Sequence, residues 1–169
     1  AFNISILICS FLIVTVFLFD DGYGISPRLR LVSQIAACGL LVILSKIYLL
    51  DMGNLLFLGN IHLGDFGPAL TIFCAVGIMN AFNMIDGLNG ICAALALIPI
   101  SYLTVLGNFS YGLLIPIGAI LGFLAYNLGY FGKKRRVFLG DSGSNMLGFA
   151  VAFVCIEYSQ NINHSSYIN

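Results

Sequence analysis

The stretch that decides how this chain is organised is Asn80-Ala81-Phe82-Asn83-Met84-Ile85-Asp86-Gly87-Leu88-Asn89-Gly90, a polar segment between two long apolar runs. Asn80, Asn83 and Asp86 are spaced by three residues, so on a helix they share one face. Amide and ionisable side chains beside a membrane-length apolar run are costly unless they serve a function. We therefore interpret this segment as one wall of a candidate site, between two membrane helices.

The composition of the whole chain agrees with a membrane location. Hydrophobic residues make up 60% of the 169 residues, charged residues only 8%, and the mean hydropathy is +1.02. Soluble domains carry about 25% charged residues, so the composition predicts an integral membrane protein. The formal net charge of zero indicates no nucleic-acid partner. The five cysteines form no CxxC pair that would indicate a metal or redox site.

Six apolar runs have, or nearly have, the length of about 17–25 residues that crosses a bilayer as a helix. The sequence predicts an all-α integral membrane protein with about six transmembrane helices. The predicted spans are residues 2–19, 31–50, 68–84, 91–106, 111–130 and 144–158. Residues 55–58 and 61–63 flank Gly59-Asn60, which is typical of a short β-hairpin, here on the outer side. The polar tail, residues 160–169, is expected to be loose.

The basic residues predict the orientation, because Lys and Arg favour cytoplasmic loops. Six of the seven follow the first or the fifth predicted span, and only Lys46 lies towards the other side. The side with Arg28, Arg30 and residues 133–136 is therefore expected to be cytoplasmic. The segment 80–90 falls on the same side.

Two further segments on that side carry chemistry. Asp20-Asp21 places adjacent carboxylates at the end of a span, where their repulsion favours binding of a proton or a cation; a simple polar end of the helix is the alternative. Gly140-Asp141-Ser142-Gly143-Ser144 precedes the last span, where free N–H groups and the helix dipole favour a phosphate. An Asp in that position suits Mg²⁺, which prefers one or two carboxylates plus phosphate oxygens. Hydroxyl caps of the helix are the alternative reading.

These segments resemble the signatures of the polyprenyl-phosphate N-acetylhexosamine-1-phosphate transferases, glycosyltransferase family 4. Leu18-Phe19-Asp20-Asp21 resembles the family's paired-aspartate motif, and residues 80–90 resemble its NAxNxxDGxDG signature. Val137-Phe138-Leu139-Gly140-Asp141-Ser142-Gly143-Ser144 resembles VFxGDxGS. The resemblance covers essentially the whole chain. The segments NAFNMIDG and Asn127-Leu128-Gly129 are most similar to the bacterial undecaprenyl-phosphate GlcNAc-1-phosphate transferases, a branch related to the phospho-MurNAc-pentapeptide translocases.

The resemblance implies a reaction, a location and partners. N-acetylhexosamine 1-phosphate, with GlcNAc as the expected sugar, would pass from a UDP-sugar to undecaprenyl phosphate with release of UMP. This is the first membrane step of cell-envelope polysaccharide synthesis. The resemblance further implies a bacterial inner membrane with the active face in the cytoplasm, Mg²⁺ or alternatively Mn²⁺ as cofactor, and it leaves a homodimer open.

It also implies roles for individual residues. Asn83 and Asp141 would be the metal ligands. Asp20 or Asp21 would act on the lipid phosphate, as a base or by positioning it, and Asp86 would lie at the metal–pyrophosphate centre. Phe138 would stack near the uracil, and Asn127 would line the nucleotide pocket. The full set of expected substrate-binding residues is Asn80, Asn89, Asn127, Phe138, Gly140 and Ser142.

Two departures from the family pattern stand out. Asn89 replaces the second Asp of the DGxDG signature, as in the eukaryotic branch, and so keeps an acceptor but loses the charge. The family also has further spans on both sides and a His-rich cytoplasmic motif. The two histidines of this chain, His62 and His164, are expected on the outer side. We therefore expect residues 1–169 to be a partial transferase core.

Two other functions stay open from the sequence. An inactive remnant or a structural membrane subunit would lack turnover. A transporter would place acidic groups near mid-span, facing one another, whereas here they fall at span ends.

Overall fold

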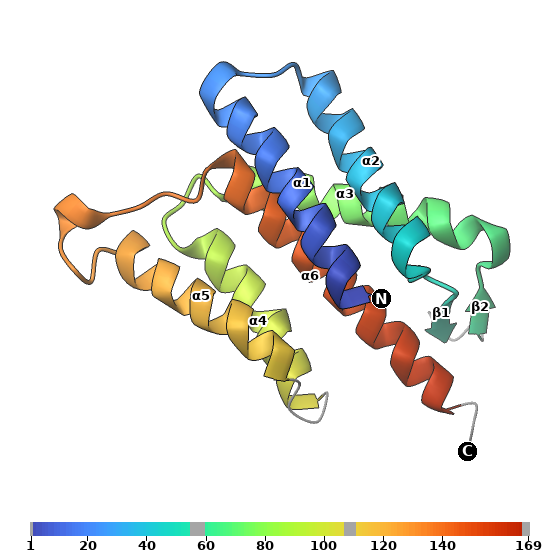
Figure 1. Ribbon diagram of the computed structural model, residues 1–169. Helices are drawn as coiled ribbons and strands as arrows, with labels where there is room; N and C mark the ends of the chain where they lie inside the picture. The colour runs from blue at the N-terminus through green and yellow to red at the C-terminus, as the bar shows by residue number, and fades with distance from the viewer. Residues whose placement is uncertain (1, 55–59, 107–110, 167–169) are drawn as a thin grey trace.

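The structure, a computed structural model, describes residues 2–54, 60–106 and 111–166, which contain six α-helices (Figure 1). The helices are α1 (Phe2–Tyr23), α2 (Pro27–Ser45), α3 (Gly67–Ile85), α4 (Ile91–Leu106), α5 (Tyr111–Asn127) and α6 (Gly140–Ser166). The shorter elements are β1 (Asp51–Asn54), β2 (Asn60–His62) and the 3₁₀ turns η2 (Gly64–Phe66) and η3 (Lys133–Arg135).

Helix α6 lies at the centre of the assembly (Figure 1). On one side it packs with α1, α2 and α3 around a core that includes Phe17, Leu41, Met79 and Phe153. On the other side it packs with α4 and α5 around a second, smaller apolar core. A Cβ added to Gly148 would lie 2.7 Å from the Cα of Met79. This close approach of α6 to α3 brings the polar ends of the two helices together.

The described helices are those of a membrane protein, which confirms the predicted fold class. Three of them are long and apolar enough, by length and composition, to cross a bilayer: Ile4–Tyr23, Pro27–Ser45 and Gly64–Ile85. Two apolar helices are shorter, Ile91–Val105 and Gly112–Asn127, and α6 is the least apolar of the six. Large apolar side chains face outward on α1 to α5, among them Phe11, Ile43, Phe73, Ile98 and Ile115. Such surfaces suit a lipid environment.

The helices that carry the candidate site are longer than the sequence predicts. Helix α1 continues through Asp20 and Asp21 to Tyr23, and it ends where Gly24, at φ 67°, donates its N–H to the carbonyl of Asp20. Helix α6 begins at Gly140 instead of Ser144 and continues to Ser166. The tail that the sequence predicts to be loose, residues 160–169, is helical up to that residue.

Helix α2 is displaced from its predicted span of residues 31–50. It starts at Pro27 because the hydroxyl of Ser26 caps the N–H of Leu29, and proline suits the first helical position. It ends at Ser45 because Lys46 adopts a left-handed conformation, at φ 58°. The residues that follow lead out to the hairpin.

The predicted hairpin is present with a different register. Strand β1 begins at Asp51, which pairs with His62, and Asn54 pairs with Asn60. Asn60 thus belongs to a strand and not to the predicted two-residue turn. The predicted first strand, residues 55–58, and Gly59 lie outside the described residues. The hairpin is at the opposite end of the assembly from the α1–α2 turn (Figure 1).

Candidate active site

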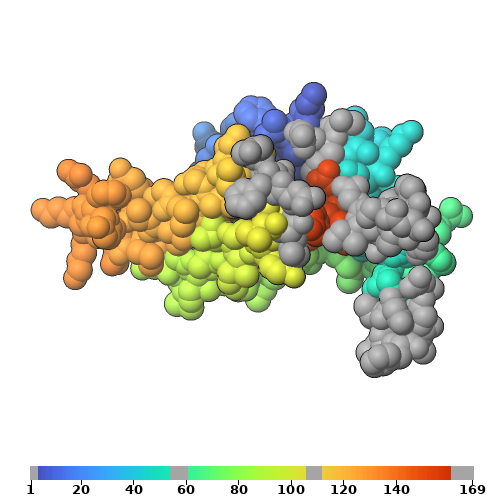
Figure 2. All heavy atoms as spheres, turned by 90° about the horizontal axis from the view of Figure 1, so that it is seen from below, coloured from blue at the N-terminus to red at the C-terminus, as the bar shows by residue number. Residues whose placement is uncertain are grey.

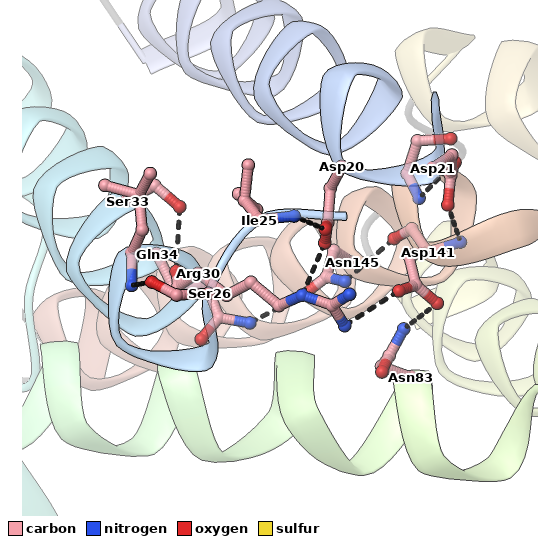
Figure 3. A network of polar contacts seen from close by, with 12 residues as sticks. Asp20, Asp21, Ile25, Ser26, Arg30, Ser33, Gln34, Asn83, Asp141 and Asn145 are labelled. Atoms are coloured by element: carbon pink, nitrogen blue, oxygen red, sulfur yellow. Dashed lines mark hydrogen bonds and ion pairs between the residues drawn. The ribbon is translucent and has the colours of Figure 1, made fainter. Parts of the chain in front are cut away.

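Four helix ends meet at one end of the assembly: the last turns of α1 and α3 and the first turns of α2 and α6. Side chains from all four point toward one another there (Figure 3). The paired aspartates, the segment 80–90 and the segment that opens α6 therefore lie together, as expected from the sequence. We call this group of polar side chains the polar cluster. Its members are Asp20, Asp21, Arg30, Gln34, Asn80, Asn83, Asp86, Asp141, Ser144 and Asn145.

Asp141 is the centre of the polar cluster. Its Oδ1 accepts a hydrogen bond of 2.9 Å from Nδ2 of Asn83, and its Oδ2 accepts one of 2.9 Å from Nη1 of Arg30. Nδ2 of Asn83 also donates to Oγ of Ser144 at 3.1 Å. Both carboxylate oxygens of Asp141 thus have donors from other helices. The two predicted metal ligands are in direct contact, with Asn83 presenting its N–H group.

Arg30 links Asp141 to the paired aspartates (Figure 3). Its Nε lies 2.6 Å from Oδ2 of Asp20, whose side chain is fully buried. Neither of these two atoms has an aligned hydrogen-bond partner, so charge is what holds them together. The other oxygen of Asp20 accepts from the backbone N–H of Ile25 at 2.8 Å. A buried carboxylate requires such partners, because its desolvation is otherwise strongly unfavourable.

Asp21 has a different environment from Asp20. Its side chain is exposed, and its two oxygens accept from the backbone N–H groups of Asp141 at 3.1 Å and Ser142 at 3.3 Å. The predicted phosphate cradle at Gly140 and Ser142 is therefore filled by a carboxylate of the chain itself. Gly140, at φ 71°, leaves the room for it, since a Cβ there would lie 3.1 Å from Oδ2 of Asp21.

Three amide side chains of the polar cluster form a continuous chain of hydrogen bonds that ends at the backbone of Asp141. Nδ2 of Asn80 donates to Oε1 of Gln34 at 2.9 Å, and Nε2 of Gln34 donates to Oδ1 of Asn145 at 2.7 Å. Nδ2 of Asn145 in turn donates to the carbonyl of Asp141 at 2.8 Å. Asn80, expected to touch substrate, is thus joined to the backbone of Asp141 through three helices.

Asp86 and Asn89 follow the end of α3. Asp86 is half-buried and caps the helix, with its N–H bonded to the carbonyl of Phe82. Burial raises the pKa of its carboxyl, and the negative charge of Asp141 raises that pKa further. Asn89 is exposed in the turn to α4, and the structure does not bring it into the polar cluster.

Asn127 is the last residue of α5, and Phe138 lies on the connection from α5 to α6. This connection projects from the assembly (Figure 2). Asn127 is 4% exposed, and its Nδ2 donates to the carbonyl of Val137 at 2.7 Å. It fixes the segment before α6 instead of joining the polar cluster, and its Oδ1 is buried without a hydrogen-bond partner among the described residues. The ring of Phe138 is 76% exposed and so is free to stack.

The chemistry of the polar cluster fits a divalent cation. Asp20, Asp21, Asp86 and Asp141 bring four carboxylates to this end, against one paired cation, Arg30. In the residues that the structure describes, no three Asp, Glu, His or Cys side chains gather closely enough to hold an ion by themselves. A cation here would use one or two carboxylates and the oxygens of a substrate, which is the coordination that Mg²⁺ prefers.

Four members of the polar cluster were not among the predicted site residues: Arg30, Gln34, Ser144 and Asn145. The sequence indicates a role for Arg30 in orientation but does not single it out as a site residue. Gln34 and Asn145 stand in or beside predicted apolar spans, and polar residues in such places indicate function. That signal could have found both of them.

Known proteins match this chain over most of its length. Residues 3–159 match the family model described as glycosyl transferase family 4. The undecaprenyl-phosphate alpha-N-acetylglucosaminyl 1-phosphate transferase of Escherichia coli (strain K12) is 32% identical over 164 residues, covering 94% of this chain and 45% of that protein. The protein of the same name from Salmonella typhi is 33% identical over 165 residues, with the same coverage of 94% and 45%.

A third relative gives a similar result. The "probable undecaprenyl-phosphate N-acetylglucosaminyl 1-phosphate transferase" of Bacillus subtilis (strain 168) is 31% identical over 159 residues, covering 90% of this chain and 43% of that protein. The chain therefore spans a little under half the length of these relatives.

Proposed function

This chain belongs to glycosyl transferase family 4. We therefore propose that the protein transfers N-acetylglucosamine 1-phosphate from UDP-GlcNAc to undecaprenyl phosphate and releases UMP. The names of the relatives support the acceptor and the sugar phosphate. The donor and the leaving group follow from the motif resemblance.

The observation that carries the proposal is the position of the polar cluster. Asp20, Asp141 and Asn83 meet at the ends of helices whose outer faces are apolar. In a bilayer, a lipid phosphate would lie at the level of these helix ends, with its chain among apolar side chains and its head at the surface. A water-soluble nucleotide sugar can reach that surface from the cytoplasm.

In the proposed reaction, an oxygen of the lipid phosphate attacks the phosphorus that carries the sugar. The bond from that phosphorus to the bridging oxygen breaks, and UMP leaves with the bonding electrons. Catalysis of such a step is mainly positioning and charge stabilisation. The ionised lipid phosphate needs no base, so one aspartate of the pair would position it.

The environments of the two aspartates favour different roles. The buried Asp20 is engaged by Arg30 and the N–H of Ile25, and so would hold the arginine in place. The exposed Asp21 can leave the N-terminus of α6 and free two N–H groups for a phosphate oxygen. Asp21 is therefore the aspartate that we place beside the lipid phosphate.

The donor would lie on the α6 side of the polar cluster. Asp141 and Asn83 are the residues that would hold Mg²⁺, or Mn²⁺ in its place, and the metal would neutralise pyrophosphate charge. Asp86 would stay next to them. Gly140 and Ser142 would contact a phosphate, and Phe138 would stack on the uracil. Asn80 would hold the backbone of Asp141 through Gln34 and Asn145, and Asn127 would hold the segment before α6.

The test is UMP release by the full-length protein in detergent, with undecaprenyl phosphate and several UDP-HexNAc donors. We expect turnover with UDP-GlcNAc that depends on Mg²⁺ and on the lipid. Asp141→Asn should reduce it at least about 100-fold, as removal of a charge-stabilising group does in other enzymes. If the full-length protein released no UMP with any of these donors, the proposed function would be wrong.

The transporter alternative gains nothing from the structure. The four candidate carboxylates lie at or just beyond helix ends, and Asp20 is neutralised by Arg30. An ion pathway would need them along the length of the helices. Flux into liposomes that depends on Asp86 would be the observation in its favour.

A further inference from the structure

Arg30 is the cation that joins the two halves of the polar cluster. Its Nη1 donates to Oδ2 of Asp141 at 2.9 Å, while its Nε lies 2.6 Å from Oδ2 of Asp20. Among the described residues, these are the ion pairs between a basic and an acidic side chain. The neighbouring Arg28 is exposed and belongs to neither of them.

We propose that Arg30 is an internal placeholder for the divalent cation: its guanidinium occupies the face of Asp141 that the metal must take, so Arg30 and the metal compete for that carboxylate. The inference rests on the proposed function, because that function assigns a metal to Asp141. It adds a role for Arg30 that neither the motifs nor the relatives' names supply.

The hydrogen bonds of Asp141 carry the first step. Oδ1 is taken by Asn83 and Oδ2 by Arg30, so no oxygen of this carboxylate lacks a donor. A metal ligand must offer lone pairs, whereas a guanidinium is all donor. The cation can therefore bind Asp141 only when a donor leaves, and Asn83 must then turn its amide oxygen toward the site.

Of the two donors, Arg30 is the one that charge will displace. A divalent cation repels a guanidinium but not an amide. The side chain of Arg30 is 35% exposed, so there is room on its solvent side for movement. The contact of Nε with the buried carboxylate of Asp20 keeps the base of the guanidinium fixed. Release of Nη1 thus needs a rotation of the group and not a change in α2.

A placeholder of this kind also explains why so acidic a cluster is compatible with folding. Without a cation, four carboxylates at one end would repel one another. One arginine that contacts two of them at once lowers that repulsion when no metal is bound. The cost of this arrangement is weaker metal binding than the carboxylates alone would give.

The test measures Mn²⁺ binding to the full-length protein in detergent, with UDP-GlcNAc present to supply phosphate oxygens and without lipid, from the loss of the free-ion signal in electron paramagnetic resonance beyond that caused by UDP-GlcNAc alone. We expect Arg30→Gln to bind Mn²⁺ roughly three- to tenfold more tightly than wild type, the range for one partly exposed charge-assisted hydrogen bond. Arg28→Gln removes the same charge two residues away and should change the dissociation constant less than about twofold. Asp141→Asn should weaken binding in every background.

Arg30→Gln leaves Asp20 buried without its counter-charge and could fail to fold, so Arg30→Lys is the second variant. An ammonium cannot contact Asp20 and Asp141 in the same bidentate manner, and we expect an intermediate gain in Mn²⁺ affinity. Unchanged or weaker binding in the folded Arg30 variants overturns the inference, and so does an equal effect of Arg28→Gln.

The binding experiment is independent of turnover. A protein that releases UMP but shows no Arg30 effect would retain the proposed function and lose the placeholder. A protein that shows the Arg30 effect but releases no UMP from any donor would retain the placeholder and lose the proposed function.

Discussion

Oδ1 of Asp21 accepts a hydrogen bond of 3.1 Å from the backbone N–H of Asp141, although 120 residues separate them in the chain. The paired-aspartate motif therefore closes the N-terminus of the helix that carries the other motif. In the proposed reaction this contact is what a substrate phosphate replaces. The two motifs belong to one site, and Asp21 has both a structural and a chemical part in it.

Because Asp21 both caps α6 and lies at the proposed phosphate site, Asp21→Asn should affect stability and turnover to different degrees. The amide keeps one acceptor for the end of α6 but loses the charge, so we expect a stability loss of only about 0.5–1 kcal/mol. Turnover should fall much more, by at least about tenfold, because a carboxylate gives up the N–H groups of α6 to the lipid phosphate, an exchange of one anion for another that a neutral amide does not make. Thermal unfolding and UMP release measure the two effects.

Asp65 provides the control for this variant. It is an exposed acid in η2, at the other end of the assembly, so Asp65→Asn should leave both quantities near wild type. Equal turnover in Asp21→Asn and wild type would exclude Asp21 from the reaction.

Asp86 gives a prediction of pH dependence. Burial, then the charge of Asp141, raises the pKa of its carboxyl above the ordinary 3.8. The folded state therefore holds this proton more firmly than the unfolded state, and stability decreases as the pH rises from about 4 through the raised pKa. Asp86→Asn removes this effect, so the variant should be more stable than wild type at neutral pH, with no such gain below the ordinary pKa.

Unfolding curves of Asp86→Asn and wild type across this pH range measure the difference. If the variant were less stable than wild type by the same amount at every pH, the carboxyl of Asp86 would not have a raised pKa in the folded protein.

The amide chain gives a prediction for Gln34→Leu. This change leaves Oδ1 of Asn145, a residue only 1% exposed, without its donor. An unsatisfied buried acceptor costs about 1–3 kcal/mol. We expect a loss of that size in thermal unfolding, and reduced turnover because Asn145 holds the carbonyl of Asp141.

The matched control is the adjacent Ser33→Ala. Ser33 is half-buried, and its hydroxyl bonds within α2 to the carbonyl of Arg30. This variant should stay within about 0.5 kcal/mol of wild type. If Gln34→Leu and Ser33→Ala had the same unfolding temperature and turnover, the chain of amide hydrogen bonds from Asn80 to Asp141 would contribute nothing to stability.

Asn89 tests the alignment of the motif's second half. It is exposed and outside the polar cluster, so Asn89→Asp adds a charge without disturbing packing. We expect turnover of the full-length protein to be unchanged or higher, measured as UMP release at saturating UDP-GlcNAc. Loss of turnover would show that Asn89 does not correspond to the second aspartate of the signature.

The sequence predicted the fold class and the meeting of the three motif segments, because apolar runs and polar interruptions are local signals. It did not predict that Asp20, Asp21 and Asp141 lie inside helices. Polar residues beside an apolar run indicate a helix end, whereas the helix capped by Gly24 and the one opened by Gly140 include them. The register of the hairpin depended on pairing that no local pattern shows.

The contacts within the polar cluster could not have been predicted, since they join residues far apart in the chain. Arg30 and Asp141 are 111 residues apart, and so are Gln34 and Asn145. Each partner has a simpler local interpretation, as an orientation signal or a polar residue in an apolar span. The close packing of α3 against α6 at Gly148 brings the ends of those two helices together, and α2 reaches the same place by packing against α1 and α3.

The measurement that tests the central claim most directly follows the phosphate attached to the sugar. The full-length protein is incubated with undecaprenyl phosphate and UDP-GlcNAc that carries ³²P in the phosphate next to the sugar. We predict that the label enters the lipid fraction with UMP as the other product, and that Asp141→Asn abolishes this transfer. Label that stays in the aqueous phase as UDP, with or without sugar on the lipid, would contradict the account.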